Sequence, residues 1–197
     1  MQYATLHSVD HEVKGPAHNV YVQMRRTRKV LRFLRTIYYS TSIRKDIPQL
    51  SRLSGDSNAL ALKVLTILEN LFTLLFYIFD HRVFLGELEV IHKDSVARYY
   101  PLSIKMYLIQ NIFGALKALM EIVIIILEGK YEYEGEMIDM DNGSTLIRNK
   151  GIQFLRNILD IFVASYLLRQ PRGQAGKAGV IGVITSLIGI AESLKVV

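Results

Sequence analysis

The pair Asp80-His81 is the group of residues in this sequence most easily imagined as catalytic, with Ser95 or His92 completing it. Adjacent residues point about 100° apart on a helix, so Asp80 cannot orient His81 as a base needs to be oriented. The sequence also contains no GxxxxGK[ST] phosphate loop, no HExxH and no GxSxG. We therefore predict that the protein is not an enzyme.

Metal-binding patterns are equally incomplete. His7 and His11 are spaced like two ligands on one helix face, but no third ligand follows them. The string DMDNG at 139–143 resembles a calcium loop without its alternating acidic positions or its later glutamate. The chain has no cysteine. The sequence thus predicts no metal and no cofactor.

A cluster of cations offers a different chemistry, the binding of anions. Residues 13–45 hold nine Lys and Arg and no acid, while the rest of the chain is close to neutral. Residues 20, 24, 27, 31, 34 and 38 lie on the apolar side, and their alternating steps of four and three are typical of one face of a helix. A helix over 20–45 would then have two faces, one basic and one apolar. The predicted basic face consists of Arg25, Arg26, Arg28, Lys29, Arg32 and Arg35, and the predicted apolar face of Val30, Leu31, Leu34, Ile37 and Tyr38.

Such a helix suits the surface of a bilayer that contains anionic lipids. Nucleic acid is the competing ligand for an arginine cluster. The aromatic residues Phe33, Tyr38 and Tyr39 lie on or near the apolar side and are not free to stack on bases. We therefore predict membrane lipids as the partner, and no nucleic acid.

The elements around this helix are apolar and helical in pattern. Half of the residues are hydrophobic and the mean hydropathy is +0.22, which is high for a soluble protein with 21% charged residues. No apolar stretch typical of a secretory signal opens the chain. We expect a polar tail at 1–19, a helical membrane-associated region at 59–169 and an anchor helix at 178–194. Within the middle region we expect helices at 59–79 (continuing to about 91 after an interruption at 80–82), 102–128 and 146–169, a connector at 95–101 and an acidic loop at 128–145.

Charged residues inside the apolar helices leave a second function open. Lys117 and Glu121 are spaced i, i+4 and could pair along one helix. Together with Lys105 and Asp160 they could instead line the pore of a small channel or transporter. A helical adaptor with a basic docking helix is the third possibility.

The segment 178–194 carries small residues at helical spacing, which permits close approach of two helices. The candidate residues for self-association are Ala178, Gly182, Ser186, Thr185 and Gly189. We expect a homo-oligomer. The predicted fold class is all-α, a membrane-associated helical bundle.

Five strings in order resemble the peroxisomal biogenesis factor 11 family. They are RKVLRFLRTI (28–37), LFTLLFYIFDHRVFLG (71–86), YLIQNIFGALKALMEI (107–122), FLRNILDIFVASYLL (154–168) and GVIGVITSLIGI (179–190). The resemblance covers about residues 28–194. It implies a peroxisomal or glycosomal membrane protein that drives elongation, proliferation and fission of the organelle. It also implies an inserting amphipathic helix, self-association, and recruitment of a dynamin-like GTPase and its adaptors.

Overall fold

Four α-helices account for most of the described chain. The structure is a computed structural model, and it describes residues 16–53, 55–128, 131–133, 136–138 and 140–169. The helices are α2 (Pro16–Asp46), α3 (Ser57–Glu87), α4 (Asp94–Glu128) and α5 (Met140–Arg169), with a 3₁₀ helix at Ile47–Leu53 after α2. The prediction of an all-α bundle is confirmed. Residues 16–19 of the predicted polar tail at 1–19 belong to α2. The rest of that tail and the predicted anchor at 178–194 lie outside the described residues.

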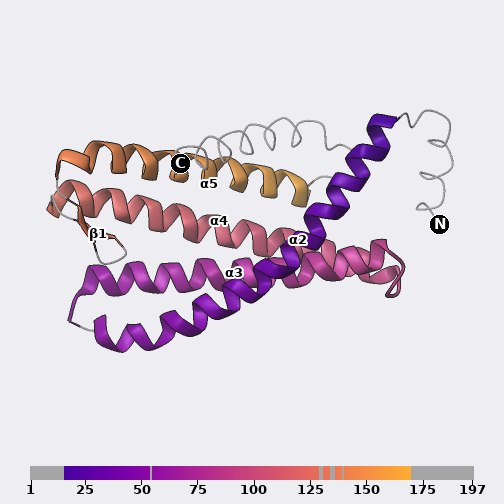
Figure 1. The fold of residues 1–197 in the computed structure, drawn as a ribbon, viewed down its shortest axis with the longest axis horizontal. Coiled ribbons are helices and arrows are strands. Elements are labelled where there is room, and N and C mark those ends of the chain that lie inside the picture. Colours follow the sequence, from indigo (N-terminus) through magenta and orange to yellow (C-terminus); the bar gives the residue numbers. More distant parts are fainter. Residues whose placement is uncertain (1–15, 54, 129–130, 134–135, 139, 170–197) are drawn as a thin grey trace.

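The helices α3, α4 and α5 lie side by side and run antiparallel to their neighbours (Figure 1). The helix α2 packs against α3 along its C-terminal half, and its N-terminal half diverges from the bundle (Figure 1). The α2–α3 turn and the α4–α5 connection lie at one end of the bundle, and the α3–α4 connection lies at the other.

The helix α3 begins at an N-cap, Asp56, and is longer than predicted. The Asp56 carboxylate accepts hydrogen bonds from the backbone N–H groups of Asn58 and Ala59 at 2.9 and 3.1 Å, as an N-cap does. The predicted interruption at 80–82 is wrong, because the helix continues without a break to Glu87. Charged residues do not break a helix when a neighbouring helix supplies partners, as α2 does here.

Two other predicted boundaries are wrong. The expected connector 95–101 is helical, since α4 starts at Asp94 and runs through Pro101. Proline inside a helix is tolerated in apolar surroundings where neighbouring groups satisfy the freed carbonyl. The acidic loop expected at 128–145 contains an antiparallel hairpin of β1 (Tyr131–Tyr133) and β2 (Glu136–Ile138), and α5 begins at Met140.

Gly86 sets how closely α3 and α4 approach at their connection. A Cβ atom at this position would lie 2.7 Å from Val96 Cγ2. That distance is shorter than van der Waals contact, and the β-branched Val96 side chain has little freedom to move away. A methyl group at Gly86 therefore forces the two helices apart.

We predict that Gly86→Ala lowers the free energy of unfolding, because overpacking costs about 1–3 kcal/mol and exceeds the gain in helix propensity. Gly151→Ala is the matched control. Gly151 is also helical but has no atom within 4 Å of an added Cβ, so this variant should gain about 1 kcal/mol. Thermal unfolding in detergent, followed by circular dichroism, measures both. A Gly86→Ala protein as stable as Gly151→Ala contradicts the close approach.

Candidate membrane-binding surface and polar seam

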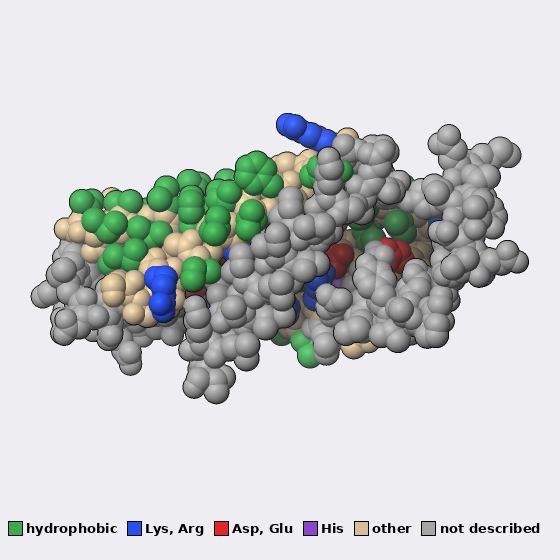
Figure 2. Space-filling view, turned by 90° about the horizontal axis from the view of Figure 1, so that it is seen from above, with side chains coloured by type: hydrophobic (Ala, Val, Ile, Leu, Met, Phe, Trp, Pro, Cys, Tyr) green, Lys and Arg blue, Asp and Glu red, His purple; other side chains and the backbone are tan. Residues whose placement is uncertain are grey.

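The outer surface of the bundle is apolar at regular helical spacing. Exposed residues recur every seven positions on α3 and α5, and at alternating steps of four and three on α4. This apolar belt consists of Val64, Leu71 and Ile78 on α3, Ile112, Leu116, Leu119, Val123 and Ile126 on α4, and Leu155 and Phe162 on α5. Figure 2 shows apolar side chains gathered along the described part of one face of the bundle.

The interior of the bundle is unusually polar. As many polar as apolar side chains are buried among the described residues. The Lys150 ammonium on α5 lies 2.7 Å from a carboxylate oxygen of Glu121 on α4, and these side chains are only 10% and 2% exposed. Lys117 on α4 lies 3.5 Å from the carboxylate of Glu69 on α3. The predicted pairing of Lys117 with Glu121 is therefore wrong, since each finds its partner on a neighbouring helix.

Further polar groups line the same contacts. The Tyr107 hydroxyl on α4 donates a hydrogen bond to Asp160 on α5. Asn157 is buried against Gly114, where an added Cβ would meet its Nδ2 atom at 2.8 Å and Glu69 Oε1 at 3.1 Å. We call the set Glu69, Tyr107, Lys117, Glu121, Lys150, Asn157 and Asp160 the polar seam.

Polar groups inside and apolar groups outside are the arrangement that a hydrocarbon solvent favours. Three described helices are long and apolar enough to cross a membrane, at Ser57–Glu87, Asp94–Leu127 and Ser144–Arg169. Three of the four residues proposed to line a pore belong to the polar seam, and the fourth does not. Lys105 is exposed, whereas Lys117, Glu121 and Asp160 each engage a different residue of another helix.

The helix α2 is held on α3 by polar and aromatic contacts along its second half. Arg32 pairs with Asp80 at 3.3 Å, and the Arg35 guanidinium donates to the Tyr77 hydroxyl at 3.5 Å. Two residues of the predicted basic face thus contact α3. The His81 ring stacks on Phe33 with centroids 3.9 Å apart.

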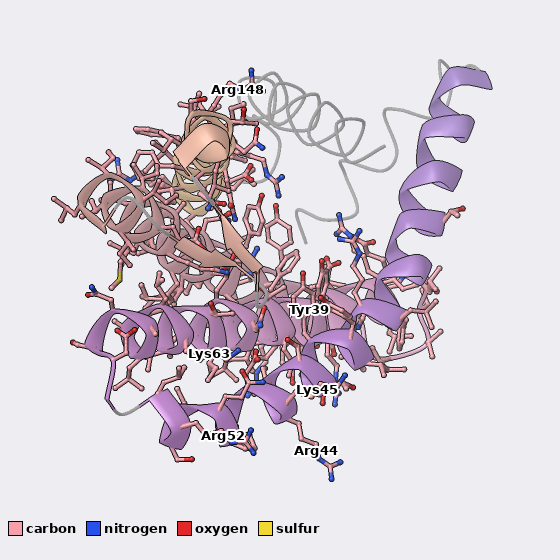
Figure 3. The ribbon with its side chains drawn as sticks, turned by 60° about the vertical axis from the view of Figure 1, so that its left-hand side comes forward. Tyr39, Arg44, Lys45, Arg52, Lys63 and Arg148 are labelled. Atoms are coloured by element: carbon pink, nitrogen blue, oxygen red, sulfur yellow. The ribbon has the colours of Figure 1, made fainter. Side chains whose placement is uncertain are left out.

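The contact continues toward the α2–α3 turn. Asn70 donates to the Ser42 hydroxyl at 3.3 Å, and Lys63 pairs with the buried Asp46 at 2.7 Å. Tyr39, labelled in Figure 3, also lies in the contact, and burial raises its pKa to about 12, with Tyr77 adding to the effect. This phenol stays neutral at physiological pH.

The side of α2 that faces away from α3 is apolar in its middle. Leu34 is 69% exposed, Ile37 66% and Tyr38 67%, so these three predicted residues form an outward apolar stripe. Arg44 and Lys45 follow on the same side toward the turn (Figure 3).

The side chains of Arg25, Arg26, Arg28, Lys29, Val30 and Leu31 lie outside the described residues, although α2 includes their backbone. The self-association residues Ala178, Gly182, Thr185, Ser186 and Gly189 also lie outside them.

Sequence reasoning missed the residues of α3 that hold α2. Lys63, Asn70 and Tyr77 recur every seven positions in an otherwise apolar helix, and Asp80 lies one further turn along. Polar side chains that repeat every seven residues on an apolar helix indicate a contact with another helix, and this pattern could have predicted the contact between α2 and α3.

The apolar belt and the buried polar seam define the class: a helical protein of a membrane. Comparison with family models then names the family. The model of peroxisomal biogenesis factor 11 (PEX11) matches residues 2–194, and the chain belongs to this family. The match begins well before residue 28, where the resemblance in the sequence starts. No curated protein and no solved structure is similar enough to match. PEX11 proteins are peroxisome biogenesis factors of the peroxisomal membrane.

We predict that Lys150→Met destabilises the bundle by about 3–5 kcal/mol, because Glu121 is left buried without a counter-charge. The double variant Lys150→Met/Glu121→Gln should recover most of this loss. The control is Lys93→Met, which breaks the exposed pair Lys93–Glu89 at 2.8 Å and should leave unfolding in detergent unchanged. Equal effects of Lys150→Met and Lys93→Met would exclude a structural role for the buried pair.

Proposed function

We propose that this protein binds and curves the peroxisomal membrane through α2, and so drives elongation, proliferation and fission of peroxisomes. Membership of the PEX11 family supports the role in peroxisome proliferation. The observation that carries the mechanism is the outward apolar stripe of α2 on a bundle that already has an apolar belt.

The stripe supplies a wedge for one leaflet of the bilayer. Burial of a Leu or Ile side chain contributes about 1.5–3 kcal/mol, so Leu34 and Ile37 together favour insertion at the boundary between headgroups and acyl chains. Inserted volume in one leaflet favours curvature toward that leaflet.

Anionic lipids are the proposed partner of the basic residues in the diverging half of α2. A Lys or Arg near an anionic surface contributes about 1 kcal/mol. Arg25, Arg26, Arg28 and Lys29 are therefore assigned to lipid headgroups. Arg32 and Arg35 have a second task, since they hold the helix on α3.

Partners beyond lipid follow from the family resemblance. We propose self-association through the small residues of 178–194, and recruitment of a dynamin-like GTPase with its adaptors to the curved membrane. Self-association places several wedges in one patch of membrane, which adds their effects on curvature.

Replacing the stripe tests the mechanism. In full-length protein reconstituted into liposomes with anionic lipid, Leu34→Glu/Ile37→Glu should abolish tubulation seen by electron microscopy. Leu34→Met/Ile37→Leu keeps the stripe apolar and should tubulate. Gln49→Glu/Arg52→Gln makes the same change in net charge elsewhere and should also tubulate. Normal tubulation by the Leu34→Glu/Ile37→Glu protein would falsify the wedge.

The contacts along α3 indicate that α2 works while it stays docked. Separation would leave Asp80 and His81 on α3 without their partners, which is costly beside lipid. The chain has no cysteine, so the double variant Ser42→Cys/Asn70→Cys can form only the disulfide between these two positions. That disulfide links α2 to α3. We predict that the oxidised and reduced forms tubulate liposomes equally. Loss of tubulation on oxidation, with recovery on reduction, means that α2 must leave α3.

A further inference from the structure

Two arginines meet at one aromatic ring where α3 connects to α4. The guanidinium carbon of Arg82, on α3, lies 5.9 Å from the centroid of the Tyr99 ring, and that of Arg98, on α4, lies 5.7 Å from it. Phe79 stacks on the same ring at 6.0 Å. The ring therefore holds two cations from different helices in one place.

Both guanidinium groups lack a carboxylate partner among the described residues, although acids are close in the sequence. Three of those acids are engaged elsewhere: Asp80 pairs with Arg32, Glu89 with Lys93, and Asp94 with His92. Arg82 and Arg98 are both exposed. Within the described part of the chain, no carboxylate neutralises their two positive charges.

The connection next to them presents apolar side chains to the outside. Leu88 is 39% exposed and Val90 67%. The turn is well defined, since Glu89 takes a left-handed φ of 60° and the Val90 N–H donates to the Leu85 carbonyl at 3.0 Å. Exposed apolar residues on an ordered turn beside two arginines match the boundary between acyl chains and headgroups.

The position along the bundle agrees with that boundary. The pair lies where two helices able to cross a membrane meet their connection. The diverging half of α2 leaves the bundle near the same end, because Arg32 contacts Asp80 and α2 runs antiparallel to α3 (Figure 1). The cationic half of α2 and the arginine pair thus lie at one end of the bundle.

We propose that Arg82 and Arg98 bind the phosphate of an anionic phospholipid, with Tyr99 orienting both groups and Leu88 and Val90 contacting its acyl chains. A planar guanidinium can bind two phosphate oxygens at once. Two such groups suit a phosphate monoester, which has three free oxygens and the larger charge. The favoured lipid is phosphatidic acid. The site is separate from the wedge of α2.

Lipid retention by the purified full-length protein tests the site. Native mass spectrometry in detergent, with added phosphatidic acid or phosphatidylcholine, counts bound lipids. We expect Arg82→Gln/Arg98→Gln to reduce affinity for phosphatidic acid about 30-fold, which corresponds to about 2 kcal/mol for the two cations together. Phosphatidylcholine should bind weakly to all forms.

Arg52→Gln/Arg148→Gln is the matched control, since it removes two exposed arginines at the opposite end of the bundle (Figure 3). This control variant should bind phosphatidic acid with the affinity of the wild type. Equal losses in the two variants indicate general electrostatics and overturn the site. Millimolar inorganic phosphate should not displace the lipid, and displacement would show a site for free phosphate instead.

Two further controls test whether the variants fold normally and whether lipid binding depends on the apolar stripe of α2. The melting temperature without lipid should match wild type in both double variants, because the substituted side chains are exposed. A lower melting temperature for Arg82→Gln/Arg98→Gln shows a structural role and overturns the proposal. Leu34→Glu/Ile37→Glu should retain phosphatidic acid, so failure of the wedge and failure of this site are distinguishable.

Discussion

The buried pair of Glu121 and Lys150 is the interaction on which the bundle depends. Both side chains are buried, and each is the other's counter-charge across the α4–α5 contact. Exchanging the pair for apolar residues could be neutral, but removing one member leaves a charge in a medium that cannot solvate it. The contact between Glu69 and Lys117 ties α3 to α4 in the same way. These pairs fix which helices are neighbours and in what register, while the apolar belt outside is free to meet lipid.

The arginine-rich helix serves two surfaces. Its second half uses Arg32 and Arg35 to contact Asp80 and Tyr77, which turns Leu34 and Ile37 outward. Its first half leaves the bundle at the end where the α3–α4 connection lies (Figure 1). In the proposed mechanism, a stripe fixed to a bundle transmits force to the bilayer better than one on a loose tether, because the helix cannot tilt to relieve the strain that it creates.

The sequence was sufficient for the fold class, the apolar stripe and the family, because helical periodicity and an ordered set of apolar strings are local properties. It was not sufficient for partners across helices. Lys117 and Glu121 have ideal spacing for a pair on one helix, yet tertiary contacts gave each another partner. Pro101 and the charges at 80–82 looked like breaks for the same reason. What satisfies such residues comes from distant parts of the chain, and periodicity carries no information about it.

The polar seam has a consequence for how the protein enters its membrane. A single helix that carried Glu121 into lipid by itself would expose an unneutralised carboxylate to hydrocarbon, and α5 alone would do the same with Lys150. If both helices enter as one hairpin, Glu121 and Lys150 form their ion pair before they reach the hydrocarbon. The pathway of biogenesis must therefore deliver at least two helices already paired. A targeting factor that released them one at a time would face the full cost of desolvating each charge.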